Sequence, residues 1–204
     1  MTLPEYFGKQ EDLMNRSLIQ IARGSTIVEA SVNNAIPLAT LTERCNKLNM
    51  EEQTSGTMHV WVPTNRYDRD YRKASMDGWN EILNAYKRDR YHGGSRELEN
   101  VEHVASYVAE QMAKDAWKPM RQKENSVPCS VTILFVERNR KRDIPNVFGG
   151  SKYAIDALTH RHKCGASAIF DDSPHWLQCV AYGRDVDPEE PGMHIVIREL
   201  RPRE

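Results

Sequence analysis

The sequence has few cysteines and no long hydrophobic run. Its four cysteines are far apart in the 204 residues and form no C-x-x-C pair, which argues against a structural zinc site and a dense disulfide framework. No segment reaches the roughly eighteen uninterrupted apolar residues of a membrane span, and residues 1–11 lack the basic-then-apolar pattern of a signal peptide. We therefore expect a cytoplasmic protein with free thiols and no membrane partner.

An excess of charge of one sign is also missing. The formal net charge is −1, and 39% of the residues are hydrophobic, which excludes a disordered acidic tail and a generally basic DNA-coating protein. Any binding to nucleic acid must therefore come from local basic patches. The length suits one domain of ordinary size with a small appendage.

Helical spacing between residues 10 and 49 predicts three helices. Thr26 is suited to cap the second, and Pro37 suits the first turn of the third. These two helices resemble a helix-turn-helix, whose second helix enters a major groove. Residues 1–56 nevertheless carry five basic and seven acidic side chains. The segment has either a DNA partner or a protein partner, and it could also be a plain helical cap or dimerisation element.

The polar stretch at residues 51–56 predicts a linker, so we expect a helical extension over 1–56 and a second domain over 57–204. In the second domain, a spacing of three and four predicts an amphipathic helix that ends near Pro119. We expect an α+β fold in which helices pack on one face of a small mixed sheet. The expected strands are 58–62, 130–136, a short strand at 168–170, and 193–200, and a further helix is expected at 151–159.

Acidic, basic and amide residues follow these strands in an order that suits chemistry on a phosphate backbone. Asp143 comes directly after a strand and a cationic run, and Asn146 lies one short turn further on. Oxygen donors at this spacing suit Mg²⁺, which takes one or two carboxylates and keeps several waters. The cationic run consists of Arg138, Arg140, Lys141 and Arg142.

A second group of residues surrounds the next helix. Gly149 and Gly150 let the backbone pass close to a ligand, and Ser151 is suited to cap the helix. Lys152 stands in the first turn, where the helix dipole does not favour a cation, so it has either a phosphate partner or a plain surface role. Asp156 lies four residues on and is placed to pair with it.

A pair of acids, Asp171 and Asp172, follows an apolar stretch and enters a turn. Carboxylates that are separated in sequence converge on one divalent cation if the chain folds back, while neighbouring cations hold a polyanion. The pattern therefore predicts metal-dependent cleavage of nucleic acid.

The same residues resemble the RusA family of Holliday junction resolvases, in particular its phage and Gram-positive members. The family's R-D-x-D-N, K-x-x-x-D-A-L and acidic pair correspond to residues 142–146, 152–158 and 171–172. The segment 79–94 is similar to an L-N-E-Y…R-x-R-Y-x-G stretch of such proteins, and with it the resemblance covers about residue 57 to the end.

The resemblance implies a homodimeric, Mg²⁺-dependent endodeoxyribonuclease that nicks branched DNA, with Mn²⁺ as an alternative metal. It implies Asp143 and Asp172 as catalytic metal ligands, and Lys152 as the residue that supports the phosphate. The remaining expected ligands are Asp171 and Asp156, and the expected DNA contacts are Arg138, Arg140, Lys141, Arg142, Asn146, Lys152, Arg88 and Arg90.

One position departs from the family pattern. Pro145 stands where the family has its second aspartate, and a proline side chain cannot bind a metal. Three alternatives follow: another acid completes the site, the site works with fewer ligands, or the protein is a catalytically impaired DNA-binding or regulatory relative. Glu137, Asp156 and Asp171 are the candidates for the replacement acid.

Overall fold

The structure is a computed structural model, and it describes residues 3–52, 55–88 and 90–200, without the side chains of 3–8, 88 and 90–93. The chain divides into two compact units, Met1–Gly56 and Thr57–Glu204. The division falls in the polar stretch where the sequence predicts a linker. Each unit is described by itself.

The first unit consists of three helices, as the sequence predicts. They bury a small core made of Ile21, Ala30, Ile36, Leu41 and Cys45. The second helix begins with a capping box: the Thr26 side chain accepts from the Glu29 N–H, and the Glu29 side chain accepts from the Thr26 N–H. The helices are α1 (Leu3–Ala22), α2 (Ile27–Asn34) and α3 (Leu38–Lys47).

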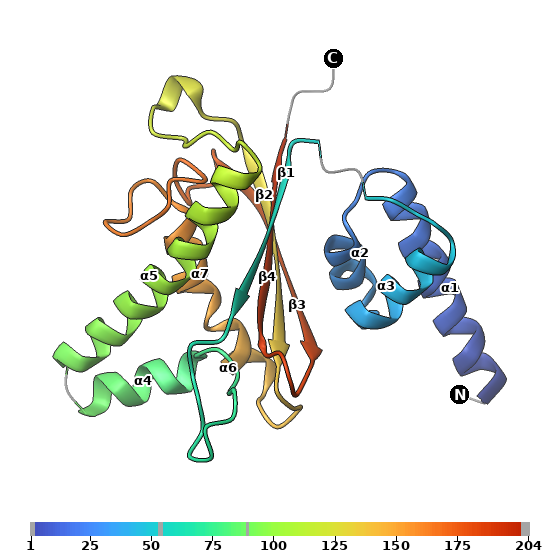
Figure 1. Cartoon of the computed structure of the whole chain (residues 1–204), viewed down its shortest axis with the longest axis horizontal. Coiled ribbons are helices and arrows are strands. Elements are labelled where there is room, and N and C mark those ends of the chain that lie inside the picture. Colours follow the sequence, from blue (N-terminus) through green and yellow to red (C-terminus); the bar gives the residue numbers. More distant parts are fainter. Residues whose placement is uncertain (1–2, 53–54, 89, 201–204) are drawn as a thin grey trace. The chain divides into compact units, whose positions relative to one another are not determined.

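The second unit is built on a four-stranded mixed sheet with the order β1-β4-β2-β3 (Figure 1). The strands are β1 (Thr57–Pro63), β2 (Cys129–Glu137), β3 (Leu177–Val186) and β4 (Gly192–Glu199). β4 pairs antiparallel with β1 and β2, whereas β3 runs parallel to β2 and forms one edge of the sheet. The predicted α+β class is confirmed.

Helices cover one face of this sheet. The long helix α5 contacts both α7 and β1, and Figure 1 shows α5 and α7 on the same side of the strands. The core between them buries Val104 and Val108 of α5, Tyr153 of α7, and Ile133 of β2. The helices of this unit are α4 (Trp79–Arg88), α5 (Arg90–Lys114), the short 3₁₀ helix η1 (Lys123–Asn125), α6 (Ile144–Phe148) and α7 (Ser151–Leu158).

Several local expectations need correction. The expected strand at 168–170 is only a bridge between Thr159 and Ile169, because the chain bends on both sides of Ile169. Gly150, with no side-chain cap, precedes α7, so Ser151 is its first residue. The helix expected to end near Pro119 ends at Lys114. Neither α4 nor β3 was expected from the sequence, and β3 gives a weak signal because most of its side chains are half-buried.

No helix in the described part of the chain is long and apolar enough to cross a membrane.

Candidate functional site

The guanidinium of Arg142 holds the carboxyl end of β2 in place, and its contacts are with other residues of the protein. Nη1 of Arg142 lies 3.1 Å from both carboxylate oxygens of Glu137 and donates to the Met76 carbonyl at 2.8 Å, while Nη2 lies 3.0 Å from Glu81 Oε2. The Glu137 side chain is only 2% exposed. Burial raises its pKa, and the charge of Arg142 offsets part of that rise. Arg142 is therefore a structural cation.

The start of α4 is joined to α6 by a hydrogen bond between distant parts of the sequence. The Asn80 N–H donates to Oδ1 of the buried Asn146 at 2.6 Å, and the Gly78 N–H donates to Glu81 Oε2 at 3.0 Å. These bonds satisfy two of the free N–H groups in the first turn of α4. A Cβ on Gly78 would lie 2.3 Å from the Asn146 carbonyl oxygen, so only glycine permits this approach.

Asp77 is the centre of a second ionic cluster. Its oxygens lie 2.9 Å from Arg66 Nη1 and 2.7 Å from Arg96 Nε, and they also accept from Asn100. Burial by itself would raise the pKa of Asp77, but the Arg96 hydrogen bond and the charge of Arg66 outweigh it and bring the pKa below its usual value. The Tyr153 hydroxyl donates to the Asp77 backbone carbonyl at 2.8 Å. The cluster therefore connects α5 and α7 to the segment before α4.

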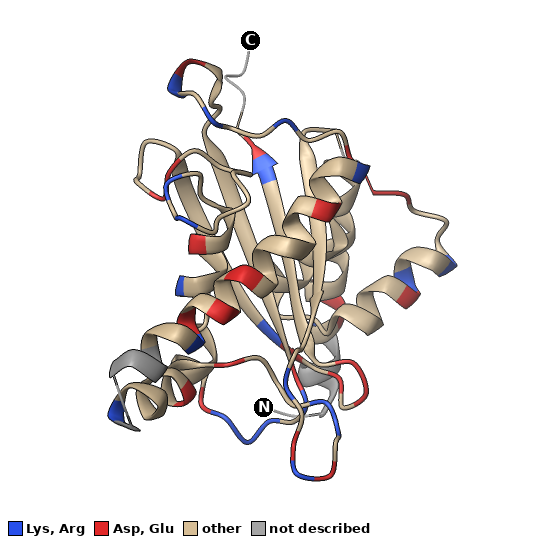
Figure 2. Ribbon diagram, turned by 60° about the vertical axis from the view of Figure 1, so that its left-hand side comes forward, with Lys and Arg blue, Asp and Glu red and all other residues tan. Residues whose placement is uncertain are grey.

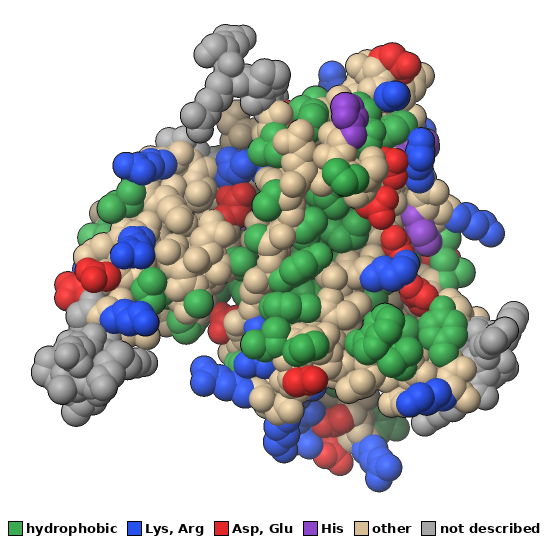
Figure 3. All heavy atoms as spheres, turned by 180° about the vertical axis from the view of Figure 1, so that it is seen from behind, with side chains coloured by type: hydrophobic (Ala, Val, Ile, Leu, Met, Phe, Trp, Pro, Cys, Tyr) green, Lys and Arg blue, Asp and Glu red, His purple; other side chains and the backbone are tan. Residues whose placement is uncertain are grey.

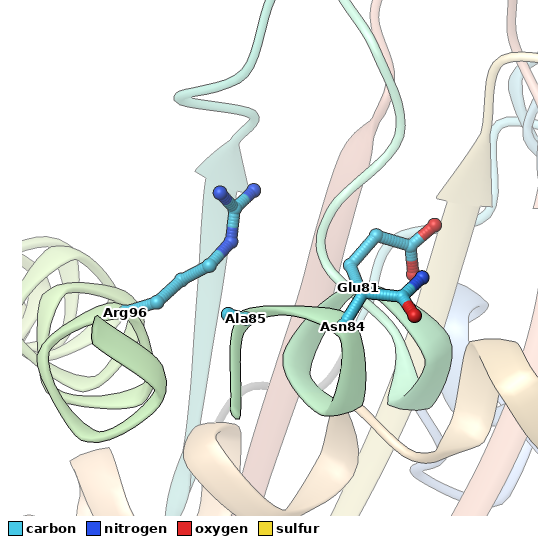
Figure 4. A pocket seen from close by; sticks show the side chains of 4 residues that line it. All are labelled: Glu81, Asn84, Ala85 and Arg96. Atoms are coloured by element: carbon cyan, nitrogen blue, oxygen red, sulfur yellow. The ribbon is translucent and has the colours of Figure 1, made fainter. Parts of the chain in front are cut away.

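A pocket of about 220 Å³ opens between α4 and α5 (Figure 4). It is lined by Glu81, Asn84, Ala85 and Arg96. Its two charged groups are already engaged, Glu81 with Arg142 and Arg96 with Asp77. The pocket therefore adjoins the ionic scaffold without offering an uncompensated charge to a ligand.

Asp143 follows this scaffold directly and is exposed. It occupies the N-cap position of α6 but makes no side-chain capping bond, and its carboxylate has no hydrogen bond or ion pair within the described residues. Arg140 and Lys141, just before it, are exposed as well. Figure 2 shows basic and acidic positions together in the loops at this end of the sheet, and further acidic positions along α5. Figure 3 shows basic and acidic side chains next to each other at the lower end of the face that it draws. The end of β2 thus presents a free carboxylate beside free cations.

Asp172 lies at the opposite end of the same strands. The parallel register pairs Cys129 with Leu177 and Glu137 with Val186; Asp172 precedes the first pair, whereas Asp143 follows the second. The Cys129 N–H bonds the Trp176 carbonyl at this end, and Arg184 Nη1 bonds the Arg142 carbonyl at the other. The eight steps of β2 span roughly 26 Å at about 3.3 Å per residue.

The other predicted acids also have separate surroundings. On α7, Lys152 Nζ lies 2.6 Å from Asp156 Oδ2, which confirms the predicted pair, and 3.3 Å from Glu97 Oε1. The hydrogen bond to Asp156 raises the pKa of Lys152, so this side chain stays a cation. Asp171 lies 3.3 Å from Arg161 Nη1 and accepts from the Asp172 N–H.

The predicted metal ligands are therefore not gathered within one chain. Asp143, Asp156, Asp171 and Asp172 are spread along the crossover between β2 and β3, and across the described ranges no three His, Cys, Asp or Glu residues are grouped to hold a metal ion. The physical reason is the parallel pairing of β2 with β3, a long-range contact that was not expected from the sequence. The assignment of these residues as ligands stays a prediction.

The predicted DNA contacts fall into three groups. Arg140 and Lys141 are free to bind a phosphate, and Arg138 pairs with Asp68. Arg142 and Asn146 are engaged in the fold, as described above. Arg88 and Arg90 lie outside the residues whose side chains are described.

No protein-family model and no curated protein sequence matches this chain. The similarity to RusA resolvases therefore stays a prediction from the motifs.

Replacing Asn146 with alanine should destabilise the second unit by about 1–2 kcal/mol, because the Asn80 N–H loses its acceptor at the start of α4. Urea unfolding measures the loss. The control is Asn139→Ala, an exposed asparagine whose side chain accepts only from a neighbouring loop N–H, and it should cost less than about 0.5 kcal/mol. Equal losses in the two variants would contradict the capping role.

Lowering the pH should decrease the stability of the folded protein, in part because Asp77 becomes protonated. Because its pKa is lowered in the folded state, its contribution is present above the unfolded pKa of about 3.9 and is lost as the pH falls through the folded value. In Asp77→Asn the urea midpoint should fall less steeply than in the wild type below about pH 4. The exposed Asp70→Asn is the control and should keep the wild-type slope. A wild-type slope in Asp77→Asn would show that this group is not responsible.

Proposed function

We propose that the protein is a structure-selective endodeoxyribonuclease that uses Mg²⁺, or Mn²⁺, to nick Holliday junctions or other branched DNA. The observation that carries the proposal is the free, exposed carboxylate of Asp143 beside the free cations Arg140 and Lys141. A rigid ionic scaffold fixes the position of this group through Arg142. A phosphodiester backbone needs both features, since cations hold the strand and a carboxylate supplies an oxygen donor.

The donor chemistry fits magnesium, and among the described residues of one chain no three His, Cys, Asp or Glu residues are grouped to hold an ion. Asp143 and Asp172 both offer free, exposed carboxylates, and they lie at opposite ends of the β2–β3 pair. When bound, the metal would stabilise negative charge on the phosphate and lower the pKa of a water molecule. We therefore propose that two copies of the chain supply the ligands of each site, Asp143 from one and Asp172 from the other.

The free edge of the sheet supports such a pairing. β3 is ten residues long, contains neither proline nor lysine, and has no neighbour on its outer side among the described strands. Edges of this kind accept another strand unless something blocks them. Two copies joined through β3 around a two-fold axis have antiparallel β3 strands, so the start of one strand lies beside the end of the other. This arrangement brings the Asp172 end of each copy toward the Asp143 end of its partner.

The chain's own residues have distinct roles in this proposal. Arg140 and Lys141 bind the phosphates of the strand near Asp143. Lys152, held as a cation by Asp156, adds a positive charge on α7. Arg142 positions Asp143 and does not touch DNA, because Glu137 and Glu81 occupy its guanidinium.

Purified protein should nick a synthetic four-way junction when Mg²⁺ is present. Asp143→Asn and Asp172→Asn should each lower the nicking rate by at least about 100-fold, the upper end of what loss of a metal ligand's support costs. The control is Asp115→Asn. Asp115 is an exposed acid directly after the end of α5, and its replacement should leave the nicking rate unchanged. If either active-site variant nicks the junction at the same rate as the wild type, the assignment is wrong.

A mixing experiment tests the shared site. Asp143→Asn and Asp172→Asn are expected to be inactive alone, whereas a one-to-one mixture contains mixed pairs with one intact site each. After subunit exchange the mixture should recover roughly a quarter of the wild-type nicking rate. A mixture that stays inactive, although sedimentation shows that the copies exchange, would mean that each site belongs to one chain.

Pro145 favours one alternative, a relative that binds branched DNA without cutting it. The residue stands in α6 where the resembled family has an aspartate, and it cannot replace that ligand. Gel-shift binding to a junction that persists in EDTA, with no product at high protein concentration in Mg²⁺ or Mn²⁺, is the result that this alternative predicts.

A further inference from the structure

The first unit contains two helices joined in a defined way. α2 ends at Asn34, α3 begins at Leu38, and the three residues between them form a tight turn (Figure 1). Ala35 has left-handed backbone angles, φ 52° and ψ 40°, and its N–H bonds back to the Ser31 and Val32 carbonyls. A helix-turn-helix has a connection of this length, often with glycine at such a position.

The packing between these helices makes them one rigid element. The small side chain of Ser31 is 2% exposed, and its hydroxyl donates to the Ile36 carbonyl at 2.7 Å. Ile36 itself is buried in the turn, and Leu41 and Cys45 are the buried side of α3. A small residue in α2 and apolar residues four apart in α3 allow close helix approach. The turn therefore holds α3 at a fixed angle to α2.

An exposed flank of α3, next to this buried side, carries hydrogen-bonding side chains. Thr40, Arg44 and Lys47 are spaced four and three residues apart, so they lie on one helix face, and all three are exposed. Arginine and threonine bind base edges in a major groove, and lysine binds phosphate. Lys47 also pairs with Glu43 on the same helix, at 2.5 Å.

We propose that α3 is a recognition helix that binds the major groove of duplex DNA, with Arg44 and Thr40 reading bases. This role goes beyond the proposed nuclease function, because it rests on the first unit alone and gives the chain a second DNA site of a different kind. The proposed nuclease site reads a branched backbone, whereas α3 reads duplex sequence.

The charge of the first unit, five basic against seven acidic side chains, opposes this binding and limits its strength. Two of its seven acids are used inside the fold, since Glu29 closes the capping box and Glu52 accepts from the Ile27 N–H. Five basic side chains remain a small number for phosphate contacts. A weak site that is covalently linked to a second DNA-binding unit still raises the overall affinity, because the linked site binds at high effective concentration. We expect α3 to direct the chain to DNA that carries its sequence.

Selection from random DNA tests this proposal with the full chain. Wild-type protein in EDTA is used to capture linear duplexes with a random segment of about 30 base pairs, enough for two half-sites, and the captured DNA is amplified and sequenced. We expect a common sequence to be enriched. Fluorescence anisotropy then compares the enriched duplex with a scrambled one, and the wild type should prefer the enriched duplex at least about ten-fold.

The variants separate α3 from the rest of the chain. Arg44→Ala and Thr40→Ala should each weaken binding to the enriched duplex, about ten-fold or more for Arg44, and leave the scrambled duplex unaffected. The control is Arg16→Ala, an exposed arginine of α1 in the same unit, which should keep the preference. Thermal melting checks that each variant is folded.

Two results would overturn the proposal. One is the absence of any enriched sequence with the wild type. The other is a preference that survives both α3 variants but is lost in the double variant Arg140→Ala, Lys141→Ala, because the second unit would then read the sequence. Junction nicking is measured separately on DNA without the enriched sequence, so a failure of the nuclease proposal leaves this test intact.

Discussion

The ion pairs of Arg142 with Glu137 and Glu81 are the interaction on which the rest of the second unit's candidate site depends. A buried carboxylate at the end of a strand is costly unless a cation compensates it, and here one guanidinium compensates Glu137, binds Glu81 in α4 and donates to the Met76 carbonyl. The end of β2, the segment before α4 and the start of α6 are thereby held together. The exposed Asp143 therefore has a fixed position, because it follows Arg142, whose guanidinium is used inside the fold and does not bind a ligand.

The same arrangement explains why motif residues have two kinds of role. Asn146 stands in a run that resembles a nuclease motif, yet its amide oxygen is engaged in capping α4. The glycine at position 78 serves that contact as well, because a larger residue would collide with the Asn146 backbone. The motifs around the candidate site therefore contain residues that build it as well as residues for which we propose a chemical role, and only contacts distinguish the two.

The sequence predicted the elements with strong periodicity and missed those whose signals are long-range. The three N-terminal helices, the cap at Thr26 and the pair of Lys152 with Asp156 depend on neighbours in the chain, and they were predicted correctly. The separation of Asp143 from Asp172 depends on the parallel pairing of β2 with β3, and β3 has no clear alternation. Asp77 was missed because its partners, Arg66 and Arg96, are defined only by tertiary folding.

The parallel pairing of β2 and β3 has a further consequence for how this protein can change. Parallel neighbours need a long crossover, and residues 138–176 supply it; every predicted metal ligand stands within that one excursion of the chain. The strands on either side carry almost none of the proposed chemistry. Replacements at exposed positions of this segment, such as Arg140, Lys141 and Asp172, can therefore change the proposed activity without disturbing the sheet, whereas replacements at Arg142, Asn146 or Tyr153 would also affect folding.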